Sequence, residues 1–206
     1  MLSLIAREIR DNLVGVTLPF IISAGMIGLM IYAFFWDIGD GVFVIPGLLM
    51  LLSFIAFCGL GAGQMYGDRA NRVSALLATL AATRNRIFFA RVVVGAVTVL
   101  AALVPVAVAV VFLLNLRLVH LEFHVRTILE VSVTTILVGF ACYCIGLQVG
   151  WTTSKARLLF GIVLWTAVVT SIVWAKGFGP WTMLLLLLFI AATLVHAWHT
   201  FTSTSL

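Results

Sequence analysis

Residues 68–91 read DRANRVSALLATLAATRNRIFFAR and form a long charged interruption between two apolar runs. Within this stretch, Val73, Leu76, Leu77 and Leu80 follow an i, i+3, i+4, i+7 pattern, which predicts an amphipathic helix over 68–81. Charged residues precede and follow this stripe in the sequence, namely Asp68, Arg69, Arg72, Arg84 and Arg86. A helix of this kind cannot cross a bilayer, but it can lie at a membrane surface and present its leucines to a partner.

The rest of the chain has the composition of a membrane protein. Of its 206 residues, 64% are hydrophobic and 9% are charged, and the mean hydropathy is +1.25. Soluble domains contain about 25% charged residues. Stretches without charge are long enough for spans of about 20 residues. Six spans are predicted, near 14–36, 42–66, 88–116, 129–150, 157–175 and 180–199. The sequence therefore predicts one all-α polytopic membrane domain over 1–206.

The distribution of basic residues predicts how the chain is oriented. With six spans, both termini lie on one side of the membrane. That side receives nine basic residues: Arg7, Arg10, Arg69, Arg72, Arg84, Arg86, Arg91, Lys155 and Arg157. The other side receives Arg117, Arg126 and Lys176. This excess predicts cytoplasmic termini and an inner (cytoplasmic) membrane. The net charge of +5 then reflects topology and not binding of nucleic acid.

A second amphipathic stretch precedes the first span. Leu2, Ile5 and Ile9 lie on one helical face, with Arg7 and Glu8 opposite. This pattern predicts a short interfacial helix over 1–11. We therefore expect two amphipathic helices on the cytoplasmic face, one at the N-terminus and one between spans 2 and 3.

Glycines at four-residue spacing occur near the inner ends of spans 2 and 4. They are Gly59, Gly63, Gly67, Gly146 and Gly150. This spacing lets membrane helices approach closely, either within one chain or at a seam between two copies. Gln64 and Gln148 lie in the same regions, and we expect both amides to form hydrogen bonds between helices.

Several catalytic signatures are absent from the sequence. It contains no G-x-x-x-x-G-K-[ST], no H-E-x-x-H and no G-x-S-x-G, which argues against a P-loop, a zinc protease and a common hydrolase site. No acidic or basic residue lies at mid-depth in a predicted span, which argues against a proton relay. Cys58, Cys142 and Cys144 lack zinc spacing and are interpreted as buried small residues. No catalytic residue, cofactor site or metal site is predicted.

The histidines offer the weaker alternatives. His120, Glu122 and His124 would share one face of an extended strand and could bind a metal or haem, but a polar rim of an interfacial loop is favoured because a fourth ligand is missing. His196 and His199, with Trp198 between them, are interpreted as an interfacial anchor. Separately, Arg126 and Glu130 stand four residues apart, which predicts a local ion pair.

The layout resembles the membrane subunit of an ABC transporter of the second permease class, exporter type. The resemblance covers the topology of the whole chain and a motif in residues 68–91. The motif comprises an acidic residue, a Leu-Leu-x-Thr-like run, a polar turn and a basic residue in the next span. These elements match Asp68, residues 76–79, Thr83 with Arg84, and Arg91. The sequence departs from the class at Ala81, where proline is usual, and in the short external loop KGFGP.

The resemblance implies alternating access, with a second permease copy of the same or another kind and with separate ATPase subunits that bind ATP and Mg. The ATPase would dock on Asp68, Arg69, Arg72, Val73, Leu76, Leu77, Leu80 and Arg84 and on the helix with Leu2, Ile5 and Ile9. Spans 2 and 5 would form the face between copies, and transport would be outward. Three alternatives stay open: a polytopic membrane enzyme, a non-transporting scaffold or sensor, and a haem-exporter-like permease.

Overall fold

The computed structural model describes residues 10, 12–35, 44–70, 84–117, 125–151 and 154–203. Six helices lie in these ranges: α2 (Leu13–Phe35), α3 (Val44–Ala70), α5 (Arg84–Arg117), α6 (Val125–Val149), α7 (Lys155–Lys176) and α8 (Pro180–Ser203). Each of the six is long and apolar enough to cross a membrane. The described part contains no strand. The predicted all-α fold is therefore confirmed for the described residues, with six helices of spanning length, while the interfacial helix over 1–11 and the helix over 68–81 stay predictions.

The helix ends differ from the predicted spans mainly at charged residues. α3 continues to Ala70 and α5 begins at Arg84, so Asp68, Arg69 and Arg84 belong to the ends of these two helices. A helix can continue with charged residues past the hydrocarbon core, because water solvates their side chains there. The remaining residues of the predicted docking surface and interfacial helix lie outside the described ranges, namely Arg72, Val73, Leu76, Leu77, Leu80, Leu2, Ile5 and Ile9.

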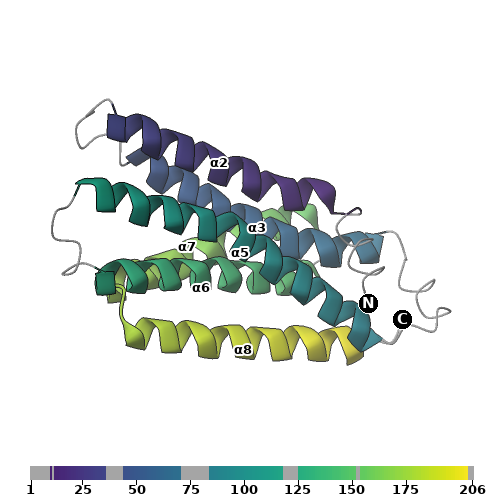
Figure 1. Ribbon diagram of the computed structural model, residues 1–206. Coiled ribbons are helices and arrows are strands. Elements are labelled where there is room, and N and C mark those ends of the chain that lie inside the picture. Colours follow the sequence, from purple (N-terminus) through teal and green to yellow (C-terminus); the bar gives the residue numbers. More distant parts are fainter. Residues whose placement is uncertain are drawn as a thin grey trace.

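The helices run in alternating directions (Figure 1). The end of the bundle where α2 begins also holds the starts of α5 and α7 and the ends of α3, α6 and α8. We call it the basic end, because Arg84, Arg86, Arg91 and Arg157 all lie close to it in sequence. The first residue of α2 and the last residue of α8 thus lie at the same end, as an even number of spans requires.

The core lies between α3 and α6, which form the most extensive helix pair in the bundle. α2 packs on α3 and α5, whereas α7 and α8 both pack on α6. Half of the spanning window of α3 is buried, compared with 17% of that of α2. The central helices therefore supply most of the buried surface, and the outer helices turn long apolar faces outward, as side chains that contact lipid do.

Glycines allow the backbones of α3 and α6 to touch. A Cβ atom on Gly146 would meet the carbonyl oxygen of Cys58 and lie 2.9 Å from the backbone nitrogen of Ala62. A Cβ on Gly150 would lie 2.7 Å from the carbonyl oxygen of Ala62. On the α3 side, Gly61 makes the matching approach to the α6 backbone. The close packing predicted for Gly146 and Gly150 is therefore present within one chain.

The other predicted glycines lie away from this crossing. A Cβ on Gly59 would meet nothing within 4 Å, and the nearest atom to one on Gly63 would be Oδ1 of Asn12 at 3.9 Å. Gly67 belongs to the last turn of α3. A seam between two copies at these positions stays a prediction.

Candidate functional site: a buried polar cluster near the basic end

Three polar side chains from three helices meet in the interior near the basic end. Gln64 of α3, Arg91 of α5 and Tyr143 of α6 are 2%, 3% and 0% exposed. Water cannot satisfy polar groups inside a membrane bundle, so such groups must find partners within the protein. We call these three residues the polar cluster.

The Tyr143 hydroxyl joins all three helices. It lies 2.8 Å from Oε1 of Gln64 and 2.9 Å from the backbone carbonyl oxygen of Arg91. A phenol has one proton to donate, so it cannot serve both oxygens fully. With Oε1 toward the phenol, the buried Nε2 of Gln64 has no partner among the described residues. The rotated amide is therefore favoured, because Nε2 then donates to the phenol and the phenol donates to Arg91.

A glycine on α5 makes room for the Tyr143 ring. A Cβ atom on Gly95 would overlap the ring at Cζ, Cε1 and Cε2 of Tyr143. Gly95 follows Arg91 by one helical turn, so the ring lies across the α5 backbone next to the carbonyl that its hydroxyl contacts. The position of the phenol therefore depends on the absence of a side chain at residue 95.

The Arg91 guanidinium extends the cluster to α8. Its Nη1 lies 3.6 Å from the sulfur of Met65, and its Cζ lies 5.7 Å from the ring centroid of Phe201. A cation held over an aromatic face is attracted by the ring electrons, and the attraction strengthens when water is excluded. Phe201 also packs against Phe88 and Trp151. A buried cation thus has aromatic and sulfur neighbours from several helices.

Burial of Arg91 was not predicted from the sequence. From the sequence alone, Arg91 is one of the nine basic residues that predict the orientation and one position of the family motif. The sequence carries no periodic signal here, because residues 87–90 are all apolar. In the structure, Arg91 falls three and four residues after the buried Phe88 and Ile87. It therefore stands on the face of α5 that turns toward the core.

Two further hydrogen bonds tie helices together near this end. Nε2 of Gln148 donates to the backbone oxygen of Thr193 at 3.1 Å, which joins α6 to α8. Nε1 of Trp198 donates to Oδ1 of Asn85 at 3.3 Å, which joins α8 to α5. Gln64 and Gln148 therefore both bond between helices, as predicted.

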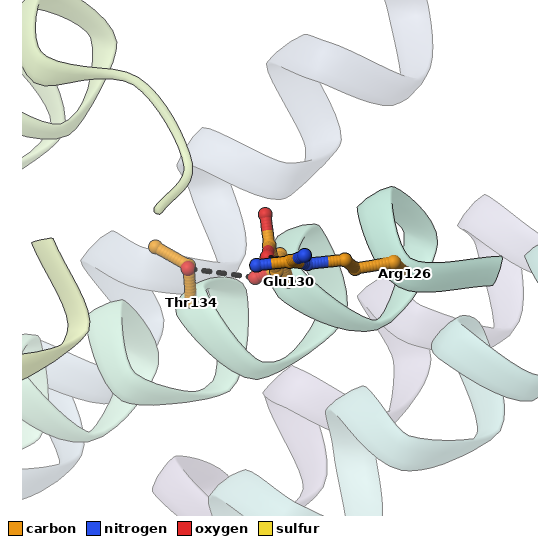
Figure 2. A network of polar contacts seen from close by, with 3 residues as sticks. All are labelled: Arg126, Glu130 and Thr134. Carbon is orange, nitrogen blue, oxygen red and sulfur yellow. Dashed lines mark hydrogen bonds and ion pairs between the residues drawn. The ribbon is translucent and has the colours of Figure 1, made fainter. Parts of the chain in front are cut away.

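The opposite end contains the predicted local ion pair. Nε of Arg126 donates to Oε1 of Glu130 at 3.0 Å, and the Thr134 hydroxyl donates to the backbone oxygen of Glu130 at 2.7 Å (Figure 2). The Arg126 side chain is 88% exposed. Exposed pairs of this kind stabilise a protein by at most about 1 kcal/mol, so we treat this pair as a local feature of the surface.

No metal centre forms among the described residues, where no three His, Cys, Asp or Glu side chains gather. His196 and His199 are exposed on α8, and the trio His120, Glu122 and His124 lies outside the described ranges. Cys58, Cys142 and Cys144 are buried and form no disulfide, in agreement with their interpretation as small core residues.

The polar cluster lies close to both attachment points of residues 71–83. Gln64 stands six residues before the end of α3, and Arg91 stands seven residues after the start of α5. At 1.5 Å per residue these separations are about 9 and 10 Å along the helices. Comparison of the chain with known protein families, curated proteins and solved structures finds no match.

Proposed function

We propose that this chain is the membrane permease subunit of an ATP-driven ABC transporter. The observation that supports the proposal best is the junction between residues 71–83 and the polar cluster. The segment follows α3 and precedes α5, and those two helices meet through Tyr143 only two turns from the segment. A force applied to the segment would thus reach the buried core by a short path.

The sequence supports a separate energy source. Transport against a gradient needs energy, and the sequence contains no P-loop. On the helix that the sequence predicts, Val73, Leu76, Leu77 and Leu80 would present an apolar face to a groove on another protein. The arginines beside it would orient that protein and speed its encounter. An ATPase that binds ATP and Mg is the partner that this arrangement suits.

The helix packing suggests which parts would move together. Gly146 and Gly150 hold α6 against α3, while the polar cluster adds α5, and Phe201 adds α8. α2 and α7 are the least buried spans, at 17% and 22%. In the proposed mechanism, the ATPase displaces the central helices as one unit, and a path opens alternately to each side between two permease copies. Outward transport follows from the family resemblance alone.

The test begins with affinity purification of the full chain from its native membranes in a mild detergent. We expect a co-purifying protein with a P-loop in about equal amount. A preparation without any such ATPase would contradict the proposal and favour a membrane enzyme. A second measurement then follows ATP hydrolysis of the complex in lipid nanodiscs while candidate substrates are added. Hydrolysis that no transported compound stimulates would favour a scaffold or sensor.

A further inference from the structure

A groove separates α7 from α8 on the outside of the helix bundle. The two helices are consecutive in the chain, and each packs on α6. The space between them has a volume of about 300 Å³. Its walls are almost entirely apolar and include Trp165, Ile172, Leu185 and Phe189. Lys176 lines one end of it.

The length of the groove matches one leaflet of a bilayer. From Lys176, the last residue of α7, to Trp165 is eleven residues, or about 16 Å of helix. The hydrocarbon core of a membrane is about 30 Å thick. The groove therefore begins at the end of the span and stops near mid-membrane, which is the depth that one acyl chain reaches.

Charge and aromatic residues mark the mouth of the groove as a headgroup region. Lys176 is exposed there, and Glu130, the sole carboxylate whose side chain is described, pairs instead with Arg126. Trp174 and Trp181 are 88% and 78% exposed beside the mouth, and tryptophan prefers the depth of lipid headgroups. A lysine at this depth attracts a lipid whose headgroup has a net negative charge.

We propose that the groove between α7 and α8 binds one anionic phospholipid, with an acyl chain along Ile172 and Leu185 and the headgroup phosphate at Lys176. A partner helix fits less well. A helix that crosses the membrane would continue past Trp165, whereas the groove ends there, near mid-membrane. The assignment needs no ATPase, but it requires that this side of α7 contacts lipid and not a second copy of the chain.

The test measures bound lipid by native mass spectrometry. The full chain is reconstituted with equal amounts of phosphatidylglycerol and phosphatidylcholine and then released under gentle conditions. We expect one retained phosphatidylglycerol per chain and a preference over phosphatidylcholine of about fivefold, which corresponds to about 1 kcal/mol for one basic residue near a membrane. Equal retention of the two lipids would overturn the proposal.

Matched variants locate the bound lipid. Lys176→Gln removes the cation at the mouth and should abolish the preference, whereas Arg157→Gln, at the other end of α7, should leave it unchanged. Leu185→Trp fills the groove and should reduce the retained phospholipid at least fivefold. Its control is Leu188→Trp, a similarly exposed position on α8 that does not line the groove.

A second variant that fills the groove keeps the test valid if Leu185→Trp does not fold. Ile172→Trp fills the groove from the α7 wall and should have the same effect as Leu185→Trp, with helix content and elution volume unchanged. Undiminished lipid in both folded variants would place the lipid elsewhere and overturn the proposal. Loss of a dimer without loss of lipid would also overturn it, because the groove would then be a seam between copies.

Discussion

The hydroxyl of Tyr143 lies 2.9 Å from the backbone carbonyl oxygen of Arg91, and this contact connects the core helix α6 to α5 just beside the charged segment of the chain. The ring can reach that carbonyl because Gly95, one turn further along α5, has no side chain. The same arginine directs its guanidinium toward Met65 and Phe201. One residue thus uses its backbone to bind α6 and its side chain to contact α3 and α8.

Removal of the phenol hydroxyl should weaken the bundle. Tyr143→Phe keeps the ring but loses the hydrogen bonds with Gln64 and Arg91, so we expect the free energy of unfolding to fall by about 1 to 2 kcal/mol. Denaturation by sodium dodecyl sulfate in mixed micelles, followed by circular dichroism, measures the change. Tyr66→Phe is the control, because the half-buried Tyr66 makes no hydrogen bond with the described residues. Identical midpoints for both variants would show that the Tyr143 hydroxyl contributes nothing to stability.

The close contact between α3 and α6 at Gly146 predicts different effects on stability for two glycine-to-alanine substitutions. Gly146→Ala places a methyl group against the backbone of α3, so we expect a loss of about 1 to 3 kcal/mol from overpacking. Gly59→Ala meets nothing within 4 Å and should be neutral or slightly stabilising, since alanine favours a helix more than glycine does. The same unfolding assay compares them. Equal stability of the two variants would rule out direct backbone contact between α3 and α6.

The alternative in which His120, Glu122 and His124 bind a metal or haem can be tested by measuring the metal and haem content of the purified chain. Replacement of His120 and His124 by alanine should leave the metal content and the visible absorption spectrum of the purified chain unchanged, because a strand face with three candidate ligands lacks a fourth. Elemental analysis and haem absorbance are the measurements, with His196→Ala and His199→Ala as the control. A stoichiometric metal or haem that disappears only in the first variant would make our interpretation of the trio wrong.

The spans and the local pairs could be predicted from the sequence. Six apolar runs separated by charge predict six helices of spanning length, because a backbone in lipid must form its own hydrogen bonds. The Arg126–Glu130 pair follows from spacing along one helix, which involves no tertiary packing. That Gln64 and Gln148 bond between helices also follows, since a polar amide in a membrane needs a partner.

The identity of those partners could not be predicted, because it depends on which helix faces lie together. The sequence does not indicate that Tyr143 is the partner of Gln64, because 79 residues separate them. Gly61 and Gly95 become informative only once α6 is seen against α3 and α5. Arg91 lies near a span end, where a surface position and a buried one look alike in sequence. Packing between distant segments decides between these two.

The central claim is that residues 68–84 dock a separate ATPase. Leu76→Asp combined with Leu77→Asp places two charges in the expected apolar face and should abolish co-purification of the ATPase while the chain stays in the membrane. Ala75→Asp combined with Ala78→Asp adds the same charge to the opposite face of that expected helix and should not. The decisive measurement is the amount of P-loop ATPase retained per chain by these two variants and the wild type. We expect retention by the wild type and the alanine-site variant and loss of at least 90% by the leucine-site variant (a tenfold change, or about 1.4 kcal/mol or more). Equal retention by all three would contradict docking through this segment.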